Sequence, residues 1–250
     1  MEALCDLLFE LSNEDRLKIL FELEKGPRSL TRIAKDLDFT SQGTSRYVAR
    51  LVETSIIRRN SDSEYELTQY GSVSLKLLSS YEFLSKNRQH FLSHDVMVLP
   101  YQFINRLGEL NVCSFQGDFI TNYVLEVEVA KQAEKYVYSM GGQLNANSPP
   151  IIAEKLKAGV EFRSIFPETI VPPPGFRPAE GVERRLLPKV QVTIMMTDKK
   201  AMFGLSTLDG KLNREYFVSE DPKFRKWCLD LFNHYWDQGK PITGAFPNLS

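Results

Sequence analysis

The sequence predicts a two-domain α+β protein: an N-terminal winged helix-turn-helix followed by a C-terminal α/β domain with a mixed sheet. Two short amphipathic helices and a hairpin pattern occupy residues 29–68, and strand-like and helix-like segments alternate from residue 112 onward. The chain has 250 residues, which is too long for a winged helix alone. Its apolar fraction of 42% is enough for two cores and excludes a largely disordered protein.

The helix-turn-helix is expected at residues 29–54. Apolar side chains recur with one-sided helical spacing between Leu30 and Leu37, and a polar break follows at residues 38–40. Ser41 is expected to cap a second helix at residues 42–54. The side chains predicted to face inward from this second helix are Thr44, Val48, Leu51 and Val52. Strand formers on both sides of the polar stretch 60–64 then predict a β-hairpin wing.

The outward side of the second helix is suited to DNA. Helical spacing places Gln42, Arg46 and Arg50 opposite the buried side. Arginine can bind guanine, and glutamine adenine, through two hydrogen bonds in the major groove. Residues 25–60 contain eight basic and three acidic side chains, a net charge of +5 in a chain of net charge −1. A solvated charged face is the alternative. The predicted DNA-contacting residues are Ser41, Gln42, Ser45, Arg46, Arg50, Arg58, Arg59 and Asn60.

Helices are also expected on both sides of this module. Two helical pieces precede it, separated near residues 12–15, and a longer helix follows at residues 68–86. The longer helix has apolar residues on one side, which either form a homodimer interface or pack on the same chain; we favour the homodimer. A two-fold dimer would bind double-stranded DNA at an inverted repeat. The predicted domains are 1–68 for DNA binding, 69–110 for a helical linker and dimerisation segment, and 111–250 for a sensor.

The C-terminal domain is predicted from alternating patterns. Strands are expected at residues 112–115, 135–140, 160–166, 191–197, 201–207 and 212–218. Helices are expected at residues 120–134, 149–158 and 222–237. The last of these carries an aromatic stripe around Trp227, which we interpret as core rather than as a ligand cage. This alternation predicts a layered α/β domain with a mixed sheet.

Few residues have the spacing of a metal or catalytic site. His90 and His94 are spaced like a metal-binding pair on a helix, but no further histidine or cysteine lies close in sequence. The three cysteines lack C-x-x-C spacing. The lack of a third ligand near the two histidines leads us to expect no metal. We find no glycine-rich phosphate loop and no G-x-S-x-G, so we also expect no cofactor and no catalytic residues. No apolar run approaches the roughly twenty residues needed to span a bilayer. The N-terminus is acidic, and we therefore expect a cytoplasmic protein without a membrane partner.

The segment through Thr68 resembles the ArsR-like and MarR-like winged-helix families of prokaryotic regulators. The matching elements are Leu30-Thr31, Ile33-Ala34, residues 39–41 and residues 51–57. The complete order of predicted elements along the chain resembles archaeal regulators, found largely in methanogens, that join such a head to a filament-regulator-type middle domain. Its matching segments are 92–95, 99–100, 150–156, 159–163, 221–224 and 227–232. This resemblance implies a transcription regulator.

The C-terminal part also resembles the sugar-sensing domain of TrmB-type archaeal regulators, a catalytically inactive relative of phospholipase D. At the positions of the H-x-K signature the chain has Gln191 and Thr193. Without the histidine nucleophile, a covalent phosphoryl intermediate cannot form. The resemblance implies a polar cleft that binds a small polar or anionic effector. The predicted effector-binding residues are Ser139, Arg163, Gln191 and Thr193.

The leading hypothesis is therefore a DNA-binding transcription regulator whose C-terminal domain senses an effector or a partner protein. One alternative is an enzyme built on the α/β domain. Another is a winged helix that binds protein instead of DNA. The predicted cleft could also be filled by its own side chains, with the domain serving dimerisation.

Overall fold

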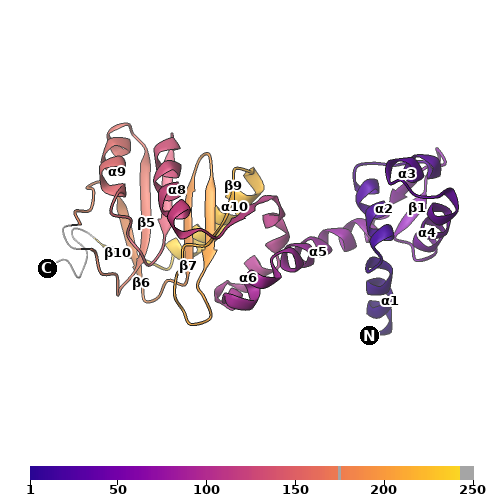
Figure 1. The fold of residues 1–250 in the computed structure, drawn as a ribbon, viewed down its shortest axis with the longest axis horizontal. Helices are drawn as coiled ribbons and strands as arrows, with labels where there is room; N and C mark the ends of the chain where they lie inside the picture. Colours follow the sequence, from indigo (N-terminus) through magenta and orange to yellow (C-terminus); the bar gives the residue numbers. More distant parts are fainter. Residues whose placement is uncertain (174–175, 243–250) are drawn as a thin grey trace. The chain divides into compact units, whose positions relative to one another are not determined.

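The computed structural model describes residues 1–173 and 176–242, and the chain divides into two compact units, Met1–Ser79 and Ser80–Ser250. The predicted two-domain α+β organisation is confirmed (Figure 1). The boundary falls inside helix α5 (Gln69–Lys86), so the predicted linker segment 69–110 contributes to both units. None of the described helices combines the length and hydropathy needed to span a bilayer.

Unit 1 contains the predicted helix-turn-helix and wing. Asn13 Oδ1 accepts a hydrogen bond from the Arg16 amide at the start of the second helix, and Ser29 Oγ accepts one from the Arg32 amide at the start of the third. Buried apolar residues of these helices form one core with residues of the hairpin. The elements are α1 (Glu2–Leu11), α2 (Glu14–Glu24), α3 (Leu30–Asp36), α4 (Ser41–Glu53), and the antiparallel strands β1 (Ile57–Arg59) and β2 (Tyr65–Leu67).

Two details of α4 differ from the prediction. Thr40, not Ser41, caps the helix: Thr40 Oγ1 accepts a hydrogen bond from the Gly43 amide at 3.1 Å. The hydroxyls of both residues can cap, and the helix begins one residue earlier than expected. Val52 is 40% exposed because it lies about 80° around the helix from Thr44, at the edge of the buried side. Thr44, Val48 and Leu51 are buried as predicted.

Unit 2 is built on an eight-stranded mixed sheet with the order β10-β6-β5-β4-β7-β8-β9-β3. The pairs β4–β5 and β5–β6 are parallel, and the other neighbouring pairs are antiparallel. The strands are β3 (Ser114–Gln116), β4 (Tyr136–Met140), β5 (Glu161–Pro167), β6 (Glu183–Leu187), β7 (Val192–Thr197), β8 (Ala201–Leu205), β9 (Tyr216–Ser219) and β10 (Lys240–Ile242). Strands β6 and β10 were not predicted, because neither has a clear strand pattern; β6 starts with three charged residues.

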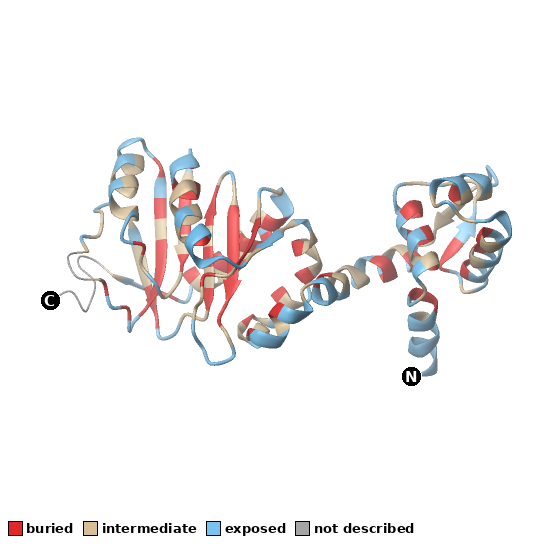
Figure 2. Ribbon diagram, viewed as in Figure 1, coloured by how far each residue is buried: buried red, intermediate tan, exposed pale blue. Residues whose placement is uncertain are grey.

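Helices cover both faces of this sheet (Figure 1). On one face, α8 (Phe119–Gln132) and α9 (Ser148–Lys157) pack on β4, β5 and β7. On the other, α10 (Pro222–Trp236) packs on β4, β7 and β8, and its aromatic stripe is core, as predicted. Buried residues therefore run along the central strands (Figure 2). The connecting helices are α6 (Arg88–Ser93), η1 (Val96–Val98), α7 (Tyr101–Ile104) and η2 (Leu107–Val112).

Candidate nucleic-acid interface and ligand cavity

Helix α4 presents a polar face to solvent. Ser41, Gln42, Ser45 and Arg46 are exposed on it, opposite the buried residues of the same helix. The Arg46 guanidinium lies over the Tyr47 ring, 5.1 Å from its centroid, and Nη2 is 3.4 Å from the Tyr47 hydroxyl. No acidic side chain of the described residues forms an ion pair with Arg46. This face therefore offers a guanidinium and an amide that can reach the edges of bases.

Arg50, also predicted to contact DNA, is tied to its own chain. Its Nε donates to Glu10 Oε1 at 2.8 Å, and Nη1 donates to Glu53 Oε2 at 3.0 Å. The Glu10 side chain is only 2% exposed, and Arg16 Nε lies 3.4 Å from its other oxygen. Removing Arg50 would leave a buried carboxylate with less compensation. Arg50 thus joins α4 to α1, a role that competes with contact to DNA.

The three predicted DNA-contacting residues of the wing differ in the contacts that they make. Arg58 pairs with Glu66, its partner across the hairpin, at 2.7 Å. Arg59 donates only to the carbonyl of Ser63, at 3.3 Å, and forms no ion pair with a described residue. Asn60 Oδ1 accepts hydrogen bonds from two backbone amides and so shapes the turn. Of these three, Arg59 retains the charge best suited to a phosphate.

One further exposed basic residue lies outside the predicted DNA-contacting set. Lys35 is exposed on α3 and, like Arg46 and Arg59, has no ion pair with the described residues. The other basic residues of segment 25–60 all pair with carboxylates of unit 1. Charge counting could not distinguish these two groups, because a count does not show which carboxylate pairs with which base. The partners Glu10, Glu22 and Glu66 also lie outside the counted segment.

Unit 2 contains a cavity of about 130 Å³ between the sheet and helices α8 and α9. Its polar lining includes Ser139, Ser164 and Thr193 from three neighbouring strands. The Oγ atoms of Ser139 and Ser164 lie 2.9 Å apart, in hydrogen-bond contact. Apolar side chains such as Phe162 and Ile152 form much of the remaining wall. This combination is typical of small-molecule sites.

Only two of the four predicted effector-binding residues lie at this cavity. Ser139 and Thr193 line the cavity, whereas Arg163 and Gln191 do not. Successive side chains of a strand point to opposite faces, so Arg163 lies on the other face from its neighbour Ser164. There it pairs with Glu161 at 2.8 Å and lies over the rings of Tyr138 and Trp236. Gln191 precedes β7, where its carbonyl accepts a hydrogen bond from the Ser206 amide.

Two other arginines contribute to the cavity wall. Arg214, just before β9, pairs with Glu126 of α8 and donates to Gln143 Oε1 at 2.9 Å. Glu126 also accepts a hydrogen bond from the Tyr216 hydroxyl at 2.8 Å. Burial and Glu126 raise the pKa of Tyr216 well above its usual range, so this hydroxyl remains a donor.

Arg184 of β6 is the second arginine, and burial lowers its pKa. Its guanidinium donates to the backbone carbonyls of Ala179 and Val182. No motif marks Arg184 or Arg214 in the sequence, because strand register and a distant glutamate place them.

The chain was compared with known proteins and protein families. The comparison with curated proteins found no match to the chain. A solved structure described as "Structure of TrmBL2, an archaeal chromatin protein, shows a novel mode of DNA binding" is 13% identical, with a TM-score of 0.44 over 92% of this chain and 94% of that one. Residues 177–238 match the family model for the middle domain of the methanogenesis regulatory protein FilR1. The expected likeness to a filament-regulator-type middle domain is thus confirmed for the part of unit 2 that includes β6 to α10.

Proposed function

We propose that this protein is a DNA-binding transcription regulator. The observation that carries the proposal is the exposed face of α4, where Gln42 and Arg46 project from a helix-turn-helix followed by a wing. The likeness of residues 177–238 to a regulatory protein family supports the same function. Inserted in the major groove, Arg46 would bind guanine and Gln42 adenine. Lys35 and Arg59 would contact phosphates, which position the helix without selecting a sequence.

The proposed regulator acts as a homodimer through α5. Five apolar side chains of this helix are exposed: Tyr70, Val73, Leu77, Tyr81 and Leu84. Their spacing of three or four residues places them on one side, which suits packing against the same helix of a second copy. A two-fold dimer reads two half-sites whose centres are about ten base pairs, or a multiple of one helical turn, apart. The proposed DNA site is therefore an inverted repeat.

The cavity of unit 2 is the proposed effector site. Ser139, Ser164 and Thr193 supply hydroxyl groups, and Arg184 supplies positive charge in the wall. These groups favour a small molecule with a polar or anionic end and an apolar body. Such a ligand changes DNA affinity only if it binds differently to two states of the regulator, with couplings of typically about 1–3 kcal/mol.

Selection from a pool of random duplexes tests the proposed function. The full chain is incubated with the pool at physiological salt, and the bound sequences are determined. We expect an enriched inverted repeat, and we expect Arg46→Ala to lose the preference at one base pair of each half-site. Arg88→Ala, which removes an exposed arginine of unit 2, is the matched control and should select the parent sequence. Absence of any enriched sequence would contradict the proposal.

A further inference from the structure

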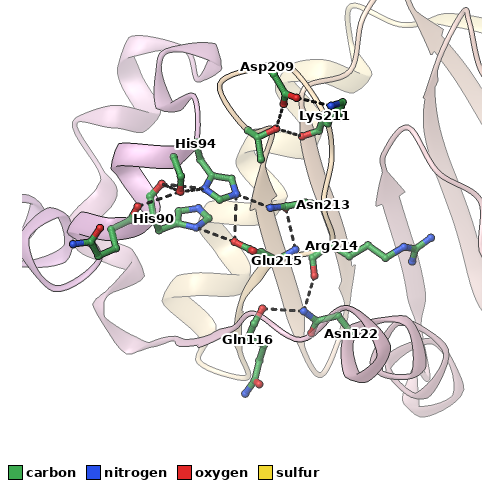
Figure 3. Close-up of polar contacts among 12 residues, drawn as sticks. His90, His94, Gln116, Asn122, Asp209, Lys211, Asn213, Arg214 and Glu215 are labelled. Carbon is green, nitrogen blue, oxygen red and sulfur yellow. Dashed lines mark hydrogen bonds and ion pairs between the residues drawn. The ribbon is translucent and has the colours of Figure 1, made fainter.

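Two histidines and a glutamate from distant parts of the sequence meet inside unit 2. His90 lies on α6, His94 directly follows this helix, and Glu215 directly precedes β9 (Figure 3). The two imidazole rings stack with their centroids 3.7 Å apart. Glu215 Oε2 is 3.8 Å from His90 Nδ1 and 3.4 Å from His94 Nε2. Both histidine side chains are buried, while that of Glu215 is 32% exposed.

The hydrogen bonds of His94 fix the direction of its lone pair. Nδ1 is 3.0 Å from the His90 carbonyl oxygen, which can only accept, and 2.9 Å from Ser93 Oγ. The Ser93 hydroxyl donates to a carbonyl of α6, so Nδ1 carries the hydrogen. In the neutral ring Nε2 is then an acceptor, and the Asn213 amide donates to it at 2.9 Å. The orientation of that amide follows from Asn213 Oδ1, which accepts the Glu215 amide hydrogen. His94 Nε2 and Glu215 Oε2 are thus two acceptors at 3.4 Å, an arrangement that a cation would stabilise.

The ring of His90 is buried without a hydrogen bond to the described part of the chain. Its side chain is 5% exposed, and neither ring nitrogen has a hydrogen-bond partner among the described residues. Buried polar atoms without partners are rare in folded proteins and call for an explanation such as an ion. A metal ion bound through one ring nitrogen would give this imidazole a partner.

We propose that His90, His94 and Glu215 bind one divalent ion of the first transition row, with zinc as the representative. Two ligands each roughly 2.1 Å from a tetrahedral zinc lie about 3.4 Å apart, close to the two separations from Glu215. Binding would require the stacked imidazole rings to rotate so that their lone pairs converge, and the ion would replace the Asn213 amide at His94 Nε2. Two imidazoles and a carboxylate favour this class of ion over Mg²⁺ and Ca²⁺, which prefer oxygen ligands. The bond from His94 Nδ1 to a backbone carbonyl is the outer contact that metal-bound histidines usually make.

The ion would connect α6 to the sheet of unit 2. Three protein ligands leave a fourth position for water, and the exposed side of Glu215 provides access from solvent. The expectation of no metal rested on the lack of a third ligand near the two histidines in sequence. Glu215 supplies that ligand from the turn before β9, where Arg214 has a φ of +56°.

Titration of the chelator-treated full chain with Zn²⁺ tests the proposal. We expect one ion per chain, and an increase in melting temperature on binding. His94→Gln and Glu215→Gln should each weaken binding by more than about 100-fold, since loss of even an outer contact costs up to that amount. His234→Gln is the matched control: it removes the remaining histidine, which packs on Phe103 and Tyr235, and should bind like the parent.

Cobalt provides a second readout that does not depend on stability. Co²⁺ bound by the parent should give the intense visible bands of a tetrahedral site with nitrogen and oxygen ligands, and Glu215→Gln should abolish them. Circular dichroism of each variant without metal checks folding. If His94→Gln does not fold, Glu215→Gln remains as the test variant, because the Glu215 side chain is partly exposed. Absence of stoichiometric Zn²⁺ binding to the parent, or parent-like binding by Glu215→Gln, would overturn the proposal.

Discussion

The candidate functional side chains face solvent in unit 1 and the interior in unit 2. In unit 1, Gln42 and Arg46 lie four residues apart on one helix and face solvent. In unit 2, the polar groups of the cavity and the pair His90 and His94 face inward and come from several elements. The first arrangement suits a large external partner such as a DNA duplex. The second suits a small ligand or an ion. Different types of evidence are therefore needed to find them.

The largest expected effect is a loss of stability in unit 2 that leaves unit 1 unchanged. Trp227 is fully buried on α10 and contacts the rings of Phe103 and Phe203 edge-on. Trp227→Ala should destabilise unit 2 by about 3–5 kcal/mol, because it leaves a large cavity in the core. Hydrogen exchange should become faster in the sheet of unit 2 and stay unchanged in α4. Tyr101→Ala, at a position 76% exposed, is the control. Equal acceleration in both units would contradict their independence.

A smaller effect is expected for the proposed dimer. Leu77 is 68% exposed on α5, and burying a leucine side chain contributes about 1.5–3 kcal/mol. Leu77→Glu should therefore shift the protein toward monomer in light scattering at micromolar concentration. Lys76→Glu, which adds a carboxylate on the same helix outside the apolar stripe, should leave the dimer intact. A parent protein that is itself monomeric would rule out the symmetric model.

The two outward arginines of α4 should behave differently in unfolding. Arg50→Ala should lower the thermal midpoint of unit 1, because Glu10 is buried and loses its shortest ion pair. Arg46→Ala should leave the midpoint unchanged, since Arg46 has no ion pair among the described residues. Thermal unfolding followed by circular dichroism compares them. Equal midpoints would show that the pair between Arg50 and Glu10 contributes little to stability.

The smallest expected effect concerns the cysteines. Cys5 is exposed, whereas Cys228 is fully buried and burial raises the pKa of Cys113 to about 12. A thiol reagent should therefore label one cysteine of the native chain and three in denaturant. Because the folded-state pKa of Cys113 exceeds its ordinary value of 9.0, the contribution of this thiol to stability is complete below pH 9 and declines toward pH 12. Rapid labelling of Cys113 in the native protein at pH 8 would contradict this environment.

Features that depend on residues close together in the sequence were predicted better than features that depend on residues far apart in it. The helix-turn-helix, its wing and the outward position of Gln42 and Arg46 depend on local periodicity, and they were predicted closely. The pairing of Arg50 with Glu10 could not be predicted, since forty positions separate the two residues and any of several carboxylates could have been the partner.

The site residues of unit 2 show the same limit. Arg163 was predicted to line the cleft together with Ser139, but strand alternation places it on the opposite face of the sheet. Strand β6, which carries Arg184, lacks an alternating pattern and was missed. Glu215 joins the two histidines only through the turn before β9. Such placements depend on sheet register and turn geometry, which local sequence patterns do not determine.

The central claim is that the exposed face of α4 reads DNA. Fluorescence anisotropy of the selected duplex, titrated with the full chain at physiological salt, tests it most directly. Arg46→Ala should bind roughly 5- to 150-fold more weakly, the equivalent of about 1–3 kcal/mol for a two-hydrogen-bond contact to a base. Arg88→Ala in unit 2 should bind like the parent. If Arg46→Ala bound the selected duplex as tightly as the parent, α4 would not be the reading helix.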